Sequence, residues 1–443
     1  MLFNNRKQYS SWGQYPKLQQ SGVIVPSWHQ SALESVDRSN ENSYLAYGKG
    51  RSYGDSCLNE NGFIIDSSNL NHIQMFDMEK GILRCESGVT FDDILSLIVP
   101  HGWFLPVTPG TRFISVGGAV ANDVHGKNHH KVGSFGNHIR TIELKRSDNT
   151  TILCSENENS NYFQATIGGL GLTGLITWVE FNLKKILNDS IYVQQKTFSS
   201  IHSFFDIDED YNNEYTVAWI DTTSVGNKLG RGVYFAGEHA KAHPVSYSKN
   251  TTSCRNLSVP LNFPGFTLNK YTVKAFNQLY FYSHQKKSGE SLSHYRPFFY
   301  PLDSVSNWNR IYGKRGFFQY QCVVPIQDGK EVVTEILRLV AKRGMASFLS
   351  VLKKFGNIPA AGLMSFPREG YTLALDFPNK GQKTLQFLED LDKLVQSVNG
   401  AIYPAKDARM SPEIFAQSFP ELENFKQYVD PAFSSSFWRR VVS

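Results

Sequence analysis

Several classes of protein are set aside by what this sequence of 443 residues lacks. It has no apolar run of about eighteen residues, the length of a membrane-spanning helix, and its polar N-terminus has no signal-peptide core. Its five cysteines are widely spaced, without a CxxC pair, which argues against a disulfide framework or a zinc module. The net charge is only +5 and no block of lysine and arginine occurs, so we expect no nucleic-acid partner. We expect a protein that is cytoplasmic or peripherally associated with a membrane.

The composition is that of a folded protein with more than one hydrophobic core. Apolar residues make up 41% of the chain and charged residues 19%, as in ordinary globular domains. A chain of this length exceeds what a single core usually serves, so two domains are expected. The composition changes near 184–189, where we expect the boundary. Aromatic residues make up 13%, enough to line a large pocket.

The first part of the chain alternates strand and helix patterns. We expect a strand near 63–68, a hairpin over 73–88, a helix over 90–99, and strands near 139–146 and 174–183. The glycines between these segments are expected in loops rather than in helices. The pattern predicts an α+β or α/β domain.

The second part is more regular. Its order is strand, helix, strand, strand, helix, strand, over the segments 317–325, 330–344, 346–354, 371–378, 384–400 and 401–404. This order is typical of a split βαβ unit. We therefore expect a second domain with an antiparallel sheet covered by helices, and an α+β fold overall.

Two glycine-rich stretches invite comparison with nucleotide-binding loops. In "YGKGRSYGD" (47–55) the spacing is GxGxxxG and a polar loop follows, so this is not the dinucleotide fingerprint, although glycines here let backbone N–H groups approach an anion. Taken alone, such a stretch is as often a simple turn. In "GGLGLTG" (168–174) a formal GxGxxG precedes a strand rather than a helix, so a Rossmann site is rejected.

A third stretch, "VGGAVANDVHGKNHHKVGSFGNH" (116–138), is rich in glycine and histidine. His125 and His129 are four residues apart, but Gly126 stands where a metalloprotease helix would need glutamate, and we expect no metal site. Histidines that only hydrogen-bond within a loop are a second interpretation. A cofactor site accounts for the glycines, the lysine and the histidines together.

These stretches occur in an order that resembles a known class of flavoproteins. "YGKGRSYGD", "PGTRFISVGGAVANDVHGKNHHKVGSFGNH" and "ATIGGLGLTGLI" are similar to the FAD-binding domain of the vanillyl-alcohol-oxidase class, the PCMH type. Within that class the chain resembles the family of decaprenylphosphoryl-β-D-ribose 2′-oxidases. The resemblance extends from "SWGQYP" to "YPAKDAR", which is nearly the whole chain. It implies an FAD-binding domain over 1–187, a substrate domain over 188–402, and a return to the first domain over 403–443.

The resemblance also implies which residues hold FAD. Many relatives attach FAD covalently through a histidine in the first loop, but this chain has Tyr53 there, so we expect non-covalent FAD. The expected cofactor-binding residues are Gly48, Lys49, Gly50, Arg51, Ser52, Tyr53, Gly54, Pro109, Gly110, Thr111, Gly117, Gly118, Ala119, Asn122, His125, Gly126, Asn128, Gly174, Ile176 and Tyr403.

By the same resemblance, Lys406 and His125 are the expected catalytic residues. Lys406 would polarise the substrate hydroxyl or accept its proton; a purely structural pairing with Asp407 or a phosphate is the alternative. His125 could equally orient FAD without moving protons. The expected substrate-binding residues are Tyr53, Lys127, Trp219, Phe299, Gln319, Gln321, Lys353, Phe355, Ala374 and Lys406.

Two positions depart from the family pattern. Ala374 replaces a pocket cysteine that hydride chemistry does not require. Phe299 replaces a tyrosine and removes a hydroxyl, which makes the exact sugar less certain.

The implied reaction is FAD-dependent oxidation of the 2′-hydroxyl of a polyprenylphosphoryl-β-D-ribose, as the oxidase half of an epimerisation that gives an arabinose donor for cell-wall synthesis. The partners implied are the lipid-linked sugar, an NAD(P)H-dependent reductase and, through the apolar residues of the irregular 240–268 stretch (Pro260, Phe263, Pro264 and Phe266), a membrane surface. Two alternatives stay open: an aldonolactone or sugar-alcohol oxidase with a soluble substrate, and a catalytically idle flavin-binding partner protein.

Overall fold

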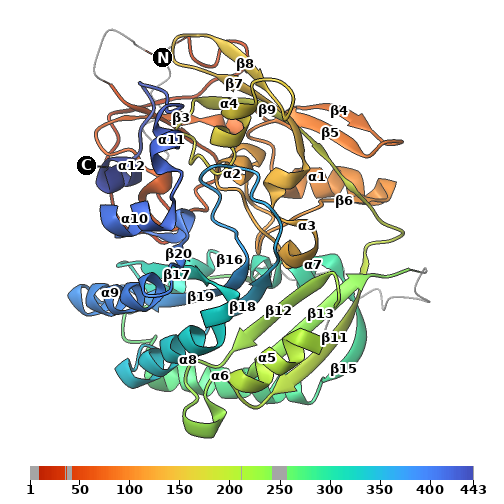
Figure 1. The fold of residues 1–443 in the computed structure, drawn as a ribbon, viewed down its shortest axis with the longest axis vertical. Helices are drawn as coiled ribbons and strands as arrows, with labels where there is room; N and C mark the ends of the chain where they lie inside the picture. The colour runs from red at the N-terminus through yellow and green to blue at the C-terminus, as the bar shows by residue number, and fades with distance from the viewer. Residues whose placement is uncertain (1–8, 35, 37–41, 211, 242–256, 443) are drawn as a thin grey trace.

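The computed structural model describes residues 9–34, 36, 42–210, 212–241 and 257–442. Its first region holds two small sheets (Figure 1). A parallel three-stranded sheet has the order β1-β3-β2, formed by β1 (Gly22–Ile24), β2 (Tyr44–Tyr47) and β3 (Phe63–Asp66). An antiparallel sheet has the order β4-β5-β9-β7-β8, formed by β4 (Ile73–Asp77), β5 (Ile82–Glu86), β7 (Ile139–Lys145), β8 (Thr151–Cys154) and β9 (Leu175–Asn182). The predicted hairpin and strands are confirmed.

Short helices accompany this region. The predicted helix is α1 (Phe91–Ile98), and Thr90 begins it with a capping box to Asp93, which satisfies two backbone donors at its first turn. The others are α2 (Val116–Ala121), α3 (His129–Val132) and α4 (Ser160–Thr166). The structure confirms that a strand, β9, follows "GGLGLTG".

One expectation about the glycines is wrong. Gly117 and Gly118 lie inside α2 rather than in a loop. A Cβ on Gly117 would lie 2.8 Å from the Cβ of Ser87 at the end of β5. Glycine is therefore needed where the helix contacts the sheet closely, and Ser115 begins the helix by accepting the N–H of Gly118.

The second region is one eight-stranded sheet with the order β15-β11-β13-β12-β18-β19-β17-β20. Its strands are β11 (Ser190–Phe198), β12 (Tyr215–Ile220), β13 (Gly232–His239), β15 (Gly289–His294), β17 (Phe317–Val324), β18 (Ser350–Phe355), β19 (Gly370–Pro378) and β20 (Ala401–Ile402). All its pairings are antiparallel. The order β18-β19-β17-β20, with one helix after β17 and one after β19, confirms the predicted split βαβ unit.

Helices cover one face of this sheet in Figure 1, namely α5 (Ile201–Asp210), α8 (Ile326–Arg343) and α9 (Gln382–Gln396). The predicted apolar faces of α8 and α9 are buried there, because residues three and four apart share one side of a helix. The other face carries α6 (Lys270–Gln285) and α7 (Tyr295–Phe299), which contact β11. Within the described ranges, no helix is both long and apolar enough to cross a bilayer.

Shorter elements complete the second region. A parallel pair joins β14 (Leu257–Ser258) to β16 (Val305–Ser306). The expected irregular segment 240–268 thus contains one short strand, while 242–256 lies outside the described residues. An antiparallel pair joins β6 (Trp103–Phe104) of the first region to β10 (Lys184–Lys185), which comes just before the second region begins.

After β20 the chain returns to the first region through α10 (Pro412–Ser418), α11 (Leu422–Lys426) and α12 (Ser436–Val442). The backbone N–H of Tyr53 donates to the carbonyl of Ala405 at 2.8 Å. Arg440 pairs with Asp55 at 2.7 Å and with Asp407 at 3.1 Å. We propose that the domain limits are 1–187, 188–402 and 403–443, because β11 enters the large sheet at Ser190 and 405–442 contacts Tyr44–Asp55.

Candidate active site

A cavity of about 960 Å³ lies between the glycine-rich segments and the face of the large sheet that carries α6 and α7. Its volume is at the upper end for small-molecule and cofactor sites. The predicted cofactor residues that line it are Gly48, Lys49, Gly50, Arg51, Ser52, Tyr53, Pro109, Gly110, Thr111, Gly117, Gly118, Asn122, His125, Gly126, Gly174, Ile176 and Tyr403. The predicted substrate residues that line it are Tyr53, Lys127, Trp219, Phe299, Gln319, Gln321, Lys353, Ala374 and Lys406.

Four predicted site residues lie behind the cavity wall instead. A Cβ on Gly54 would lie 1.6 Å from the carbonyl oxygen of Asp407, so this glycine lets the returning chain pack closely. Ala119 is buried in α2, and the Asn128 amide donates to the carbonyl of Pro106 at 2.8 Å. The centre of the Phe355 ring lies 4.8 Å from the centre of the His125 ring. These residues support others that face the cavity.

The wall formed by 46–53, 108–122 and 170–176 has little side-chain bulk and several free polar groups. Cβ atoms built on Gly110 and Gly171 would meet nothing within 4 Å, so these glycines leave space at the wall. The buried hydroxyls of Ser56 and Ser87 line the cavity, and neither has a hydrogen-bond partner in the described structure. Small residues and unpaired donors suit a large, flat group with a diphosphate, because backbone and hydroxyl groups can approach its oxygens.

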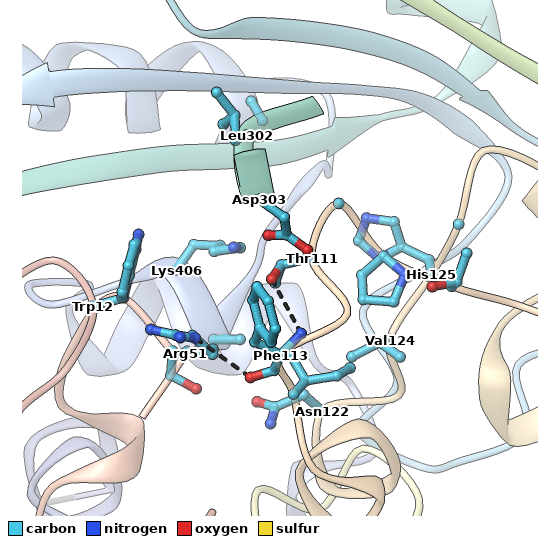
Figure 2. Close-up of a pocket in the computed structure, with 18 of the residues that line it drawn as sticks. Trp12, Arg51, Thr111, Phe113, Asn122, Val124, His125, Leu302, Asp303 and Lys406 are labelled. Carbon is cyan, nitrogen blue, oxygen red and sulfur yellow. Dashed lines mark hydrogen bonds between the residues drawn. The ribbon is translucent and has the colours of Figure 1, made fainter. Parts of the chain in front are cut away.

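Arg51 is fixed on this side of the cavity. Its Nε donates to the carbonyl of Phe113 at 3.3 Å, and its guanidinium lies 4.2 Å from the centre of the Trp12 ring. In Figure 2, Arg51 and Lys406 approach from one side of the pocket and His125 from the other. Trp12 and Phe113 were not predicted, because no local spacing links them to Arg51.

His125 is held neutral in the wall. Burial, together with the nearby charges of Lys353 and Lys406, holds its pKa well below the usual value. The Gln321 amide nitrogen donates to His125 Nε2 at 3.0 Å and to Thr372 Oγ1 at 3.2 Å. His125 Nε2 therefore accepts, so the ring proton is on Nδ1. Nδ1 is buried and has no protein partner in the described structure, which leaves it able to donate to a bound group.

Lys406 is partly buried beside an acid that the sequence did not single out. Lys406 Nζ lies 3.8 Å from the centre of the Tyr53 ring, and burial lowers its pKa to about 7 against the opposing effect of Asp376. Burial raises the pKa of Asp376 to about 7, although Gln319 donates to it at 2.6 Å and Tyr312 at 3.3 Å. In the described chain Asp407 pairs with Arg440 rather than with Lys406, so of the structural alternative only a pairing of Lys406 with a phosphate stays open.

Asp376 could have been found from the strand period. It lies two residues after Ala374 in β19, and residues two apart in a strand point to the same face. Ala374 lines the cavity, so Asp376 points toward the same side and is covered by Gln319. The alternation of side chains along a strand does not show, however, that the carboxylate of Asp376 lies near Lys406, which comes from another part of the chain.

Two further lysines, besides Lys406, add positive charge to the cavity wall. Lys127 donates to the carbonyl of Phe298, and burial lowers its pKa to about 7. Lys353 donates to the carbonyl of Gly126 at 3.2 Å, and burial lowers its pKa to about 8. Burial of such groups is costly without a counter-charge, so the cavity favours an anionic ligand.

Aromatic residues that sequence reasoning missed form another part of the wall. Phe235, Tyr280, His284, Phe298 and Trp308 all line the cavity. Tyr280 and His284 are four residues apart in α6, a spacing that places both on one side of the helix. The helical period could have grouped them, but nothing in the sequence shows that this side of α6 faces the cavity.

Comparison with known proteins identifies the class. The model of the FAD binding domain family matches residues 21–155, which contain the first two glycine-rich stretches of the wall. The chain is 34% identical, over 98% of its length and 97% of the relative's, to decaprenylphosphoryl-β-D-ribose oxidase of Mycolicibacterium smegmatis. The chain belongs to this family of FAD-dependent oxidoreductases, and FAD is its cofactor.

Two other relatives are more distant. An uncharacterised protein of Streptomyces coelicolor is 28% identical over 80% of this chain and 100% of its own length. Mouse L-gulonolactone oxidase is 28% identical over 33% of this chain and 32% of its own length. The predicted cofactor class is thus confirmed.

In the part of the chain that the structure describes, no group of three or more candidate metal ligands comes together.

Proposed function

We propose that this enzyme oxidises the 2′-hydroxyl of a polyprenylphosphoryl-β-D-ribose to a ketone. The observation that carries the proposal is the similarity over nearly the full length of both chains to a decaprenylphosphoryl-β-D-ribose oxidase. A match limited to 21–155 would support FAD binding alone, whereas this one also includes the large sheet that carries Lys353 and Gln321. The lysine-rich part of the cavity supports an anionic substrate such as a sugar phosphodiester.

When bound, FAD supplies the hydride acceptor. The protein must then bind the sugar, exclude water and remove the hydroxyl proton. Lys406 is our candidate for the last task, because a neutral amine near pH 7 can accept a proton and a charged amine cannot. Asp376 lies close enough to influence Lys406 and would stabilise the ammonium once the proton has arrived.

His125 is our candidate for orienting the flavin. Its Nε2 accepts from Gln321, so its Nδ1–H remains to donate. A histidine whose pKa is well below its usual value stays neutral through the physiological range. We therefore assign the proton transfer to Lys406 rather than to His125.

A second protein would complete an epimerisation. Inversion at the 2′ carbon requires the ketone to receive a hydride on the opposite face. An NAD(P)H-dependent reductase is the class of enzyme that supplies this hydride, and we propose such a partner. The lipid part of the substrate calls for contact with a membrane surface as well.

The test of the proposed reaction is anaerobic flavin bleaching by stopped flow. A polyprenylphosphoryl-β-D-ribose should bleach the bound flavin, and the product should be the 2′-keto sugar by mass spectrometry. Bleaching by aldonolactones or free polyols instead would support the soluble-substrate oxidase. Absence of bleaching by any of these compounds would leave the flavin-binding partner protein.

We also propose that the FAD is held without a covalent bond, because Tyr53 occupies the position of the histidine to which many relatives link it. Acid precipitation of the yellow protein should leave all of the flavin in the supernatant. Flavin fluorescence on the denatured polypeptide in a gel would contradict this.

A further inference from the structure

One side of α6 is apolar and faces solvent. Tyr271, Ala275, Leu279 and Tyr282 are spaced at intervals of three or four residues, which places them on one face of the helix. Tyr271 is 72% exposed, Leu279 73% and Tyr282 50%. Large apolar groups grouped on an exposed face are a common sign of a binding surface.

The fold does not need this face. The opposite side of α6 buries Val273, Asn277 and Phe281, and the helix contacts β11 and β13. The Asn277 amide donates to Asp221 at 3.0 Å and to the carbonyl of Ser347 at 3.2 Å. The helix is thus anchored from inside, and its outer residues can serve another purpose.

The segment before the helix extends the apolar surface. Phe266 is 78% exposed, and its carbonyl accepts from the amide of Asn269, the residue that caps α6, at 3.0 Å. Thr272 in the first turn donates to the carbonyl of Thr267 at 2.8 Å. Phe266 therefore adjoins the first turn of the helix. We call Phe266, Tyr271, Leu279 and Tyr282 the α6 surface.

The charges that α6 and its flanking residues carry are all positive. Between Leu257 and Gly289 the sequence has four lysines and no aspartate or glutamate. Lys270 and Lys274 lie in the helix, Lys286 and Lys287 directly follow it, and all four are exposed. Such a surface attracts anionic groups and repels a second copy of itself.

The helix that carries the α6 surface also forms part of the cavity wall. Tyr280 and His284, on another side of the same helix, line the cavity wall. The Tyr280 ring lies 4.5 Å from that of Trp219, a predicted substrate residue. One helix therefore has one side at the site of the sugar and another side in solvent.

We propose that α6 docks the enzyme on an anionic lipid bilayer, with the α6 surface in the headgroup region and its lysines on the lipid phosphates. Tyrosine and lysine are suited to this depth, since each combines an apolar body with a polar end. The purpose of the docking rests on the proposed function: a substrate with a long lipid could present its sugar to the cavity without leaving the membrane.

The test uses the full-length, FAD-loaded protein and vesicle flotation. The probes are vesicles of phosphatidylcholine alone and vesicles in which about a third of the lipid is phosphatidylglycerol. We expect binding to the anionic vesicles that is at least about tenfold tighter than to the neutral ones and that weakens with salt. Equal binding to both, or none to either, would overturn the proposal.

Two sets of variants locate the contact. The triple variant Tyr271→Ser/Leu279→Ser/Tyr282→Ser and the pair Lys274→Glu/Lys286→Glu should each weaken binding at least about tenfold. Matched controls are Met78→Ser/Val225→Ser, at exposed apolar positions elsewhere, and Lys342→Glu/Lys383→Glu on α8 and α9. The controls should bind as the wild type does. Unchanged binding of both α6 variants would show that another surface makes the contact.

Two further measurements separate the failure of this proposal from that of the proposed function. Flavin bleaching by a short-chain, detergent-soluble phosphoryl pentose should be the same in the triple variant and the wild type. If no phosphoryl pentose bleaches the wild type, the proposed function fails while the vesicle result still stands. Sedimentation velocity tests one other occupant of the α6 surface. If the wild type forms dimers, the triple variant does not, and neither protein binds vesicles, then the α6 surface is a contact between two copies of the chain.

Discussion

The two sides of the cavity are built in different ways. On the side of the glycine-rich segments, the wall is mainly backbone, small residues and hydroxyls around the fixed guanidinium of Arg51, and contacts such as that between Gly54 and the returning chain hold it in place. On the side of the large sheet, the wall carries partly buried ionisable side chains, among them Lys353 on β18 and Lys406 just after β20. We therefore propose that one side recognises the cofactor by shape, while the other changes charge during turnover.

If this comparison is right, substitutions on the two sides should fail differently. A larger side chain on the side of the glycine-rich segments should lower both the free energy of unfolding and the FAD content. A change of charge on the side of the large sheet should leave both of these unchanged and affect only the rate of flavin reduction or its dependence on pH.

The largest effect is expected from Gly54→Ala. The added Cβ would lie 1.6 Å from the Asp407 carbonyl oxygen, and backbone cannot move aside as a flexible side chain can. We expect a loss of about 3 kcal/mol in the free energy of unfolding, with reduced FAD content. Urea denaturation and the flavin absorbance measure both. Gly265→Ala, whose Cβ would meet nothing within 4 Å, is the control and should change stability by less than about 0.5 kcal/mol.

Next in size is Lys406→Ala. We expect FAD and stability to be retained and flavin reduction to slow at least about a hundredfold, or about 2.7 kcal/mol of barrier. In the wild type the rate should rise with pH through about 7, the pKa of Lys406, because only the neutral amine accepts a proton. Stopped-flow bleaching measures both, and the variant should lose that rise. The control is Lys354→Ala, next to the cavity residue Lys353 in β18, and it should reduce flavin as fast as the wild type. If Lys406→Ala also reduces flavin at the wild-type rate, Lys406 has a structural role only.

The sequence could predict the scaffold better than the charges in the site. The split βαβ unit was visible because helix and strand periods differ in 317–404, and each period follows from local geometry. The expectation that Gly117 and Gly118 lie in a loop is wrong, and at Gly117 close packing on Ser87 outweighs the low helix propensity of glycine. The meeting of Lys406 with Asp376 depends on two elements brought together by the fold, which no local pattern encodes.

A smaller effect is expected from Asp376→Asn. The amide oxygen would still accept from Gln319, while the amide NH2 would donate to the Tyr312 hydroxyl, and the charge that raises the pKa of Lys406 would be gone. The pKa of Lys406 should fall, so the rise in rate should move to lower pH, while the maximal rate drops less than about tenfold. A pH series of bleaching rates tests this, with Asp390→Asn, at a partly exposed position of α9, as control. An unmoved profile would mean that Asp376 does not act on Lys406.

The smallest effect is expected from Ala374→Cys, which restores the thiol of the family pattern. Ala374 lines the cavity on β19, opposite Gln321 on β17 and Val351 on β18, where one sulfur atom adds little volume. A thiol is not needed to remove a hydride or a proton, so kcat and KM should stay within about threefold of the wild type. Steady-state assays of the two proteins, prepared side by side, are sufficient. A rate increase of tenfold or more would show that the sheet side binds the sugar through this position, and that the substitution to alanine has changed which sugar fits.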